Sequence, residues 1–275
     1  MSRISQCFSQ LKTQGKKALI PYITAGDPNL ETSLGLMHAL VVNGADVIEL
    51  GFPFSDPSAD GPVIQRAVER SLAMHTRLID VLDLVKKFRT SNNITPIVLM
   101  GYLNPVECMG YQIFADACLS AGVDGVLLVD MPPEEAGDLH AILRGAGLDT
   151  IFLVAPTTNA QRAETICKLS SGYVYYVSLK GVTGAGHLDV ESVVSNLTLL
   201  RQHTTLPLGV GFGISDSETA ARIATVADAV VVGSALINKI EQLKNNVNYS
   251  AAELVAHTAL IRTMRVAMDA SNKCN

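Results

Sequence analysis

The sequence predicts an α/β fold: a single-domain (β/α)8 TIM barrel with an extra N-terminal helix. Short apolar runs rich in Val, Ile and Leu alternate with longer stretches of helical periodicity. These runs number eight, the strand count of this barrel. Neither a linker nor a shift in composition divides the chain, so we expect one domain over residues 1–275. An open doubly wound sheet is the alternative, but it usually has fewer units and one recognisable nucleotide crevice.

Most of the predicted strands are near-continuous in aliphatic residues, which is typical of buried parallel strands. They are expected at 18–23, 46–51, 95–100, 124–129, 150–154, 173–177, 206–211 and 228–232. Helical patterns follow at 30–43, 77–89, 110–120, 133–146, 159–170, 189–202, 216–225, 234–244 and 250–270. Ile4, Phe8 and Leu11 share one helical face and predict the extra helix. Ser215 and Glu218 have the spacing of a capping box.

Charge and hydropathy exclude two classes of protein. The net charge is -5, and basic residues form no cluster beyond adjacent lysine pairs, so a nucleic-acid partner is not expected. The longest apolar stretch, at 94–106, is interrupted by proline, glycine and asparagine, so it does not predict a membrane span. The N-terminus lacks the long apolar core of a signal peptide. We therefore expect a cytoplasmic protein with no membrane association.

The five cysteines are odd in number and widely scattered. They form no C-x-x-C pair, and the sequence has no H-E-x-x-H motif. This pattern indicates free thiols in a reducing compartment and gives no support for a structural zinc site.

Glu49 is the first candidate for chemistry because it lies near the end of the second predicted strand, and barrel enzymes place their chemistry at carboxyl ends of strands. Alternation places Val47, Glu49 and Gly51 on one face and Ile48 and Leu50 on the other. If the aliphatic pair faces the helices, Glu49 points into the barrel mouth. An unpaired buried carboxyl group there would have a raised pKa, as suits a general acid or base. A structural pairing with Lys or Arg is equally compatible with this position.

The loop at 52–62 contains three prolines and the carboxylates of Asp56 and Asp60. Proline restricts the backbone, so these carboxylates are held in place. A second carboxylate near Glu49 would form an acid/base pair in which each environment sets a different role. Aspartate beside proline or glycine is also a common turn former, which is the favoured interpretation for Asp56 and an open alternative for Asp60.

Glycine-rich turns follow the last three predicted strands, at 180–186, 211–215 and 233–234. Glycine lets backbone amides approach an anion, and the last two turns begin helices whose N-termini favour negative charge. Glycine also ends many strands for structural reasons, so the coincidence of three turns carries the prediction of a phosphate site. No turn completes a P-loop or dinucleotide fingerprint, so no nucleotide cofactor is expected.

Aromatic residues are scarce, and five of them fall at or just beyond predicted strand ends: Tyr22, Phe52, Tyr102, Tyr175 and Phe212. Each alone is compatible with ordinary core packing. Together they predict a flat apolar ligand, such as an aromatic ring, beside the phosphate site.

Six motifs carry the most specific information. They are PYITAGDP at 21–28, ELGFPFSDPSADGP at 49–62, MGYLNP at 100–105, GVTGA at 181–185, GFGI at 211–214 and GSA at 233–235. In content and order they closely resemble the tryptophan synthase α-subunit family. The resemblance implies a (β/α)8 barrel that cleaves indole-3-glycerol phosphate to indole and glyceraldehyde 3-phosphate, by a retro-aldol reaction without Schiff base or metal. Indole C3 is protonated, the C–C bond breaks, and a glycerol hydroxyl loses its proton.

The resemblance also assigns residues to roles. Glu49 matches the principal acid/base, and Asp60 matches the carboxylate that accepts the indole N–H and stabilises positive charge on the ring. Thr183 matches a residue that closes over the site and meets Asp60. The expected substrate-binding residues are Gly184, Gly213, Gly233 and Ser234 for the phosphate, Tyr22, Met100, Tyr175 and Phe212 for the indole, with Thr183 and Tyr102 beside them.

The same resemblance implies a partner, a β subunit in an α2β2 complex, to which indole passes internally. Pyridoxal phosphate belongs to that subunit, so this chain is expected to hold no cofactor. Three further interpretations remain: a catalytically silent phosphate-binding regulatory subunit, another phosphosugar barrel such as a ketose-phosphate isomerase or a Schiff-base aldolase acting through Lys180, and a stand-alone lyase.

Overall fold

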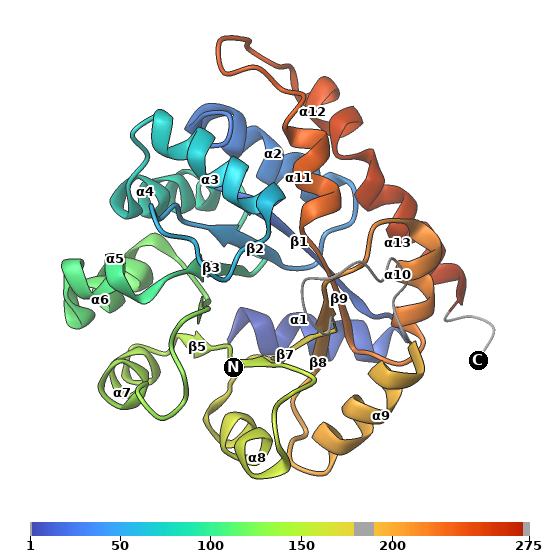
Figure 1. Ribbon diagram of the computed structural model, residues 1–275. Coiled ribbons are helices and arrows are strands. Elements are labelled where there is room, and N and C mark those ends of the chain that lie inside the picture. The colour runs from blue at the N-terminus through green and yellow to red at the C-terminus, as the bar shows by residue number, and fades with distance from the viewer. Residues whose placement is uncertain (1, 179–189, 272–275) are drawn as a thin grey trace.

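The computed structural model describes residues 2–178 and 190–271, in which parallel strands form one sheet that curls into a barrel surrounded by helices (Figure 1). The strand order is β5-β4-β3-β2-β1-β9-β8-β7-β6. The strands are β1 Ala18–Thr24, β2 Ile48–Gly51, β3 Ile97–Gly101, β4 Gly125–Leu128, β5 Asp149–Thr150, β6 Leu153–Val154, β7 Val174–Val177, β8 Leu208–Gly211 and β9 Ala229–Val232. The predicted (β/α)8 barrel is confirmed.

The predicted strand at 150–154 is divided into β5 and β6, and this division closes the barrel. β5 pairs with β4, whereas β6 pairs with β7. Between them, the amide of Ile151 donates to the Val126 carbonyl at 2.9 Å, and the Phe152 carbonyl accepts from the amide of Tyr175 at 3.1 Å. One bent segment therefore joins the two edges of the sheet and serves as a single barrel strand.

The described helices cover the outside of the barrel and also close one of its ends. They are α1 Arg3–Thr13, α2 Leu30–Val42, α3 Pro62–Ala73, α4 Leu78–Arg89, α5 Leu103–Met109, α6 Tyr111–Ala121, α7 Gly137–Gly145, α8 Ala160–Leu169, α9 Val190–Arg201, α10 Ser217–Ala224, α11 Ser234–Ile240, α12 Ala251–His257 and α13 Ala259–Ser271. The helix expected at 250–270 is two helices, because Thr258 ends α12.

Three local features differ from the sequence prediction. Helix α3 was not predicted, although Pro62 occupies its first turn, where proline needs no amide partner. Helix α5 was also not predicted. The expected capping role of Ser215 is wrong: Asp216 is the N-cap of α10 and accepts from the amide of Thr219 at 2.8 Å.

The apolar core has two layers separated by the sheet. Ile48 and Leu50 belong to the outer layer, where the strands pack against the helices. Val47 belongs to the inner layer, inside the barrel, together with Tyr173 and Tyr175. The alternation expected for 46–51 is therefore confirmed, and Glu49 shares the inward face.

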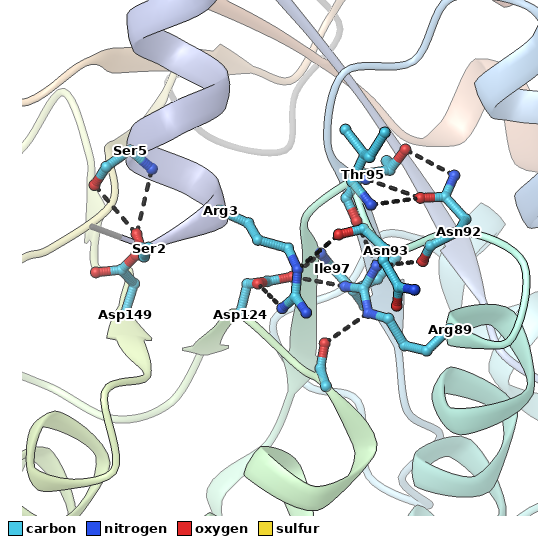
Figure 2. Close-up of polar contacts among 12 residues, drawn as sticks. Ser2, Arg3, Ser5, Arg89, Asn92, Asn93, Thr95, Ile97, Asp124 and Asp149 are labelled. Carbon is cyan, nitrogen blue, oxygen red and sulfur yellow. Dashed lines mark hydrogen bonds and ion pairs between the residues drawn. The ribbon is translucent and has the colours of Figure 1, made fainter.

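Helix α1 closes the barrel at the amino ends of the strands, and Ile4, Phe8 and Leu11 insert into the inner layer. Asp124, just before β4, fixes this end by bonding Arg3 of α1 at 2.8 Å and Arg89 of α4 at 2.7 Å (Figure 2). The carboxyl ends of the strands are left open on the opposite side. Over the part of the chain that the structure describes, no helix combines the length and apolarity needed to cross a membrane.

Candidate active site

The open end of the barrel holds a cavity of about 370 Å³. Its walls come from the carboxyl ends of strands, from the loops after β8 and β9, and from helices α3 and α11. The lining residues are Tyr22, Glu49, Asp60, Gly61, Ile64, Met100, Tyr175, Phe212, Gly213, Ile214, Ser215, Val231, Gly233, Ser234, Ala235 and Asn238. Two carboxylates therefore face one largely apolar space.

Glu49 is the second residue of the four-residue strand β2 and is completely buried. The Tyr173 hydroxyl donates to its Oε1 at 2.5 Å, while Oε2 has no hydrogen-bond partner among the described residues. Burial raises the pKa of Glu49 to about 7, and the hydrogen bond from Tyr173 opposes this rise by favouring the ionised form. Within the described chain no Lys or Arg is paired with it. Near neutral pH the carboxyl group is therefore able both to give and to take a proton.

Asp60 is half-buried at the end of the loop that precedes α3. The Tyr102 hydroxyl donates to its Oδ2 at 2.8 Å and accepts from the amide of Ala59 at 3.1 Å. Gln65 of α3 donates to the Asp60 carbonyl at 2.8 Å. Desolvation raises the pKa of Asp60, and the Tyr102 hydrogen bond opposes that rise.

The two aspartates of the loop at 52–62 differ in environment. Asp60 donates its amide to the Pro57 carbonyl, as in a turn, but its side chain also lines the cavity. Asp56 is exposed, lies outside the cavity lining and accepts from Ser55 at 2.6 Å. The turn interpretation therefore suffices for Asp56 but not for Asp60.

Two tyrosines cross the barrel mouth where the neighbouring strands end in glycine. A Cβ at Gly51 would collide with the Tyr22 hydroxyl, and one at Gly211 would collide with the Tyr175 hydroxyl. Tyr22 and Tyr175 are both buried and line the cavity. The glycines at the ends of β2 and β8 thus make room for the aromatic walls.

The loops after β8 and β9 present backbone rather than basic side chains. Phe212 and Gly213 adopt φ of 75° and 74°, a left-handed conformation that is strained for phenylalanine. Phe212 is 43% exposed and lines the cavity. Gly233 is the N-cap of α11 and provides no side-chain cap, and Ser234 is the first residue of the helix. Because no lining residue in the described segments is Lys or Arg, an anion here would depend on backbone amides.

The structure brings together most of the predicted site residues. Those that line the cavity are Glu49, Asp60, Tyr22, Met100, Tyr175, Phe212, Gly213, Gly233 and Ser234. Tyr102 lies behind Asp60 and holds it by the hydrogen bond described above. Thr183, Gly184 and Lys180 fall in 179–189, outside the described residues.

Several residues of the site were not singled out from the sequence. Tyr173 directly precedes β7 and belongs to the same inner layer as Tyr175, so the alternation expected over 173–177 could have identified it. Ile64 lies on α3, which was not predicted, and Asn238 is one turn along α11 from Ser234. In the described part of the chain, no group of three or more His, Cys, Asp or Glu side chains is placed to hold a metal ion.

Comparison with known proteins gives a consistent result. A family model described as tryptophan synthase alpha chain matches residues 8–268. The chain is similar to the tryptophan synthase alpha chain of Nitrosococcus oceani, with 56% identity over 98% of this chain and 99% of that protein. The protein of that name from Thioalkalivibrio sulfidiphilus is 58% identical over 98% of this chain and 100% of its own length.

Among solved structures, tryptophan synthase subunit alpha from Legionella pneumophila str. Paris superposes with a TM-score of 0.88. It is 46% identical in sequence, and the match covers 98% of this chain and 99% of that one. The similarity therefore extends over the whole barrel, including the loops that form the cavity.

Proposed function

This chain belongs to the tryptophan synthase alpha chain family, and we propose that Glu49 and Asp60 are its catalytic residues. The family's reaction is the retro-aldol cleavage of indole-3-glycerol phosphate to indole and glyceraldehyde 3-phosphate. The observation that carries our proposal is the completely buried carboxyl group of Glu49, which has no cationic partner among residues 2–178 and 190–271 and lines the same cavity as Asp60.

Glu49 carries the protons that the cleavage moves. The reaction adds a proton to indole C3 and removes one from the glycerol hydroxyl, so that the C–C bond breaks and an aldehyde forms. A group with a pKa of about 7 has both forms available at neutral pH, which suits a residue that donates in one step and accepts in another. Its Oε2, which lacks a partner in the described chain, is the oxygen available to the substrate.

Asp60 stabilises the charge that develops on the ring. Protonation of C3 makes the indole nitrogen positive, and a carboxylate that accepts its N–H lowers the energy of that state. Tyr102 and Gln65 hold Asp60 from both sides of the loop, so its position is set before substrate binds. Tyr102 is thus a positioning residue in this proposal.

The substrate lies across the cavity between two different surfaces. The apolar and aromatic side chains of Tyr22, Met100 and Tyr175 suit the indole ring. The turns at Gly213 and at Gly233 and Ser234 suit the phosphate, because helix N-termini and free backbone amides favour anions.

The family works as an α2β2 complex with the tryptophan synthase β subunit, where the pyridoxal phosphate resides, and the alpha chain needs no cofactor of its own. We further propose that residues 1–275 act as one domain in the cytoplasm. The single sheet and its common inner core support the proposal of one domain. The cytoplasmic location is compatible with the free thiols of four cysteines, Cys7, Cys108, Cys118 and Cys167.

The test is indole release from indole-3-glycerol phosphate by the purified chain, alone and with its cognate β subunit. We expect slow release alone, strong acceleration with the β subunit, and a loss of about 10³-fold in kcat for Glu49→Gln. Full turnover by that variant would refute the assigned role. Fast release without the β subunit would indicate a stand-alone lyase, and no release at all would favour a silent regulatory subunit. A borohydride-trapped adduct would indicate a Schiff-base aldolase.

A further inference from the structure

A charge network lies beside the cavity and joins three elements of the fold. Asp27, which follows β1, is only 1% exposed. Arg70 of α3 binds both of its carboxylate oxygens, Nε to Oδ1 and Nη2 to Oδ2, each at 2.8 Å. A bidentate pair with a buried carboxylate fixes the orientation of the arginine more firmly than a single exposed contact does. Arg70 is therefore anchored to the barrel through the loop after β1.

The remaining amino group of Arg70 reaches helix α11. Its Nη1 donates to Oε1 of Glu241 at 3.0 Å, and Glu241 is the C-cap of α11. Arg66, one turn earlier on α3, donates to the same carboxylate at 3.0 Å. A carboxylate at a helix C-terminus is unfavourable by itself, because that end carries partial negative charge. The two arginines reverse this effect and tie the end of α11 to α3.

The two helices joined by this network carry different parts of the site. α3 begins at Pro62, two residues after Asp60, and its Gln65 donates to the Asp60 carbonyl. α11 begins directly after Gly233, and Ser234 starts its first turn. Where the helices meet, the space beside Gly233 is bounded by Ile64 of α3. The turn at Gly233 and Ser234 is called the phosphate turn below. A shift of α11 along α3 would move this turn relative to Asp60.

We propose that Arg70 and Glu241 are positioning residues that hold the phosphate turn of α11 at a fixed distance from Asp60. This inference rests on the proposed function, because it concerns how the two halves of that site are held together. Neither residue lines the cavity. Their effect is thus transmitted through the placement of α11, and it falls mainly on the binding of the phosphate group.

Glu241→Gln is the sharpest variant, because it removes the charge that joins α3 to α11 but leaves the bidentate Arg70–Asp27 pair intact. In the complex with the cognate β subunit, we expect KM for indole-3-glycerol phosphate to rise about 5-fold while kcat stays within about 2-fold. Inorganic phosphate, used as a competitive inhibitor, should lose affinity by the same factor, because the phosphate turn is what moves.

Two further variants serve as controls. Glu164→Gln breaks an exposed ion pair with Lys168 on α8 and should leave KM, kcat and phosphate inhibition unchanged. Arg66→Gln removes two contacts to Glu241, from Nε to Oε1 at 3.0 Å and from Nη2 to Oε2 at 3.4 Å. Unlike Arg70, Arg66 is not anchored to Asp27, so the link between α11 and the barrel remains and we expect less than about a 2-fold change in KM. An effect of Arg66→Gln as large as that of Glu241→Gln would overturn the role assigned to Arg70.

The inference also fails if Glu241→Gln lowers the melting temperature but leaves KM and phosphate inhibition at their wild-type values, since that result indicates a purely structural contact. The wild-type protein separates this outcome from a failure of the proposed function. If the proposed function is wrong, the wild type itself does not cleave the substrate. If only this inference is wrong, the wild type cleaves and the variant matches it.

Discussion

Replacing Glu49 by glutamine is expected to make the protein more stable, by an amount that depends on pH. Glutamine keeps the volume and the oxygen that accepts from Tyr173, but it has no charge to bury. The ordinary pKa of 4.5 for this carboxyl group is raised to about 7 by burial. The unfolded chain therefore ionises first as the pH rises, and the wild-type protein loses stability between these two values.

The magnitude follows from the same pKa values. Each pH unit corresponds to about 1.4 kcal/mol, so the rise from 4.5 to about 7 destabilises the wild type by about 3 kcal/mol once both states are ionised. At pH 5 most of this destabilisation of the wild type has not yet developed, and the free energies of unfolding of variant and wild type differ by about 1 kcal/mol. At roughly 2 °C per kcal/mol for a chain of this size, the variant should melt about 2 °C above wild type at pH 5 and about 6 °C above it at pH 8.5.

The assay is thermal unfolding of both proteins, followed by circular dichroism, at several values between pH 5 and pH 8.5. Glu135→Gln is the matched control, since Glu135 is exposed and its charge meets water in both states. The melting temperature of this control should differ from that of the wild type by the same small amount at every pH. A Glu49→Gln difference that does not grow with pH would show that the buried carboxyl group is not held near neutrality, and the acid/base argument would lose its basis.

Three other changes test separate contacts. Tyr173→Phe removes the hydrogen bond that favours ionised Glu49. The apparent pKa near 7 in the pH profile of kcat/KM should therefore rise by about one unit, and an unchanged pKa would contradict this. Gly211→Ala should destabilise the protein by about 1–3 kcal/mol in thermal unfolding, because its methyl group meets the Tyr175 hydroxyl; an unchanged melting temperature would refute that close approach. Asp124→Asn leaves Arg89 buried without its counter-charge and should destabilise by about 3 kcal/mol, while kcat of the folded enzyme is unchanged; a loss of kcat would show that the closed end of the barrel influences the chemistry.

The barrel itself was predictable because aliphatic strands and amphipathic helices each have a characteristic period. The division of 150–154 into β5 and β6 was not, since it depends on which neighbour each half meets, β4 or β7. Helix α3 was hidden by the proline-rich loop before it, although Ile64, Ala67, Val68 and Ser71 form its buried face. The residues of α3 after Pro62 were given no assignment from the sequence, and α3 packs against α11 and β1 in the structure.

At the site, sequence alternation predicted which way Glu49 points but not what it meets. Whether Glu49 had a basic partner remained open, because the answer depends on Tyr173, 124 positions away in the chain. Asp60 could equally have been a turn residue until Tyr102 was placed beside it. The Asp27–Arg70–Glu241 network had no signal in the sequence, since its members come from three separate elements that only the closed barrel brings together.

Asp124 and Glu49 are buried carboxylates at opposite ends of the barrel, and their charges are compensated to different extents. At the closed end, Asp124 is bound by two arginines and by the amide of Ile97 at 2.8 Å, so its charge is fully compensated. At the open end, in the described chain, Glu49 meets one tyrosine hydroxyl and no cation. A fold selected only for stability would pair or remove such a group, because a lone buried charge opposes folding. The difference between Asp124 and Glu49 therefore supports the proposed location of the chemistry, independently of any motif. It also explains why Glu49→Gln should lower kcat about 10³-fold and yet strengthen the fold.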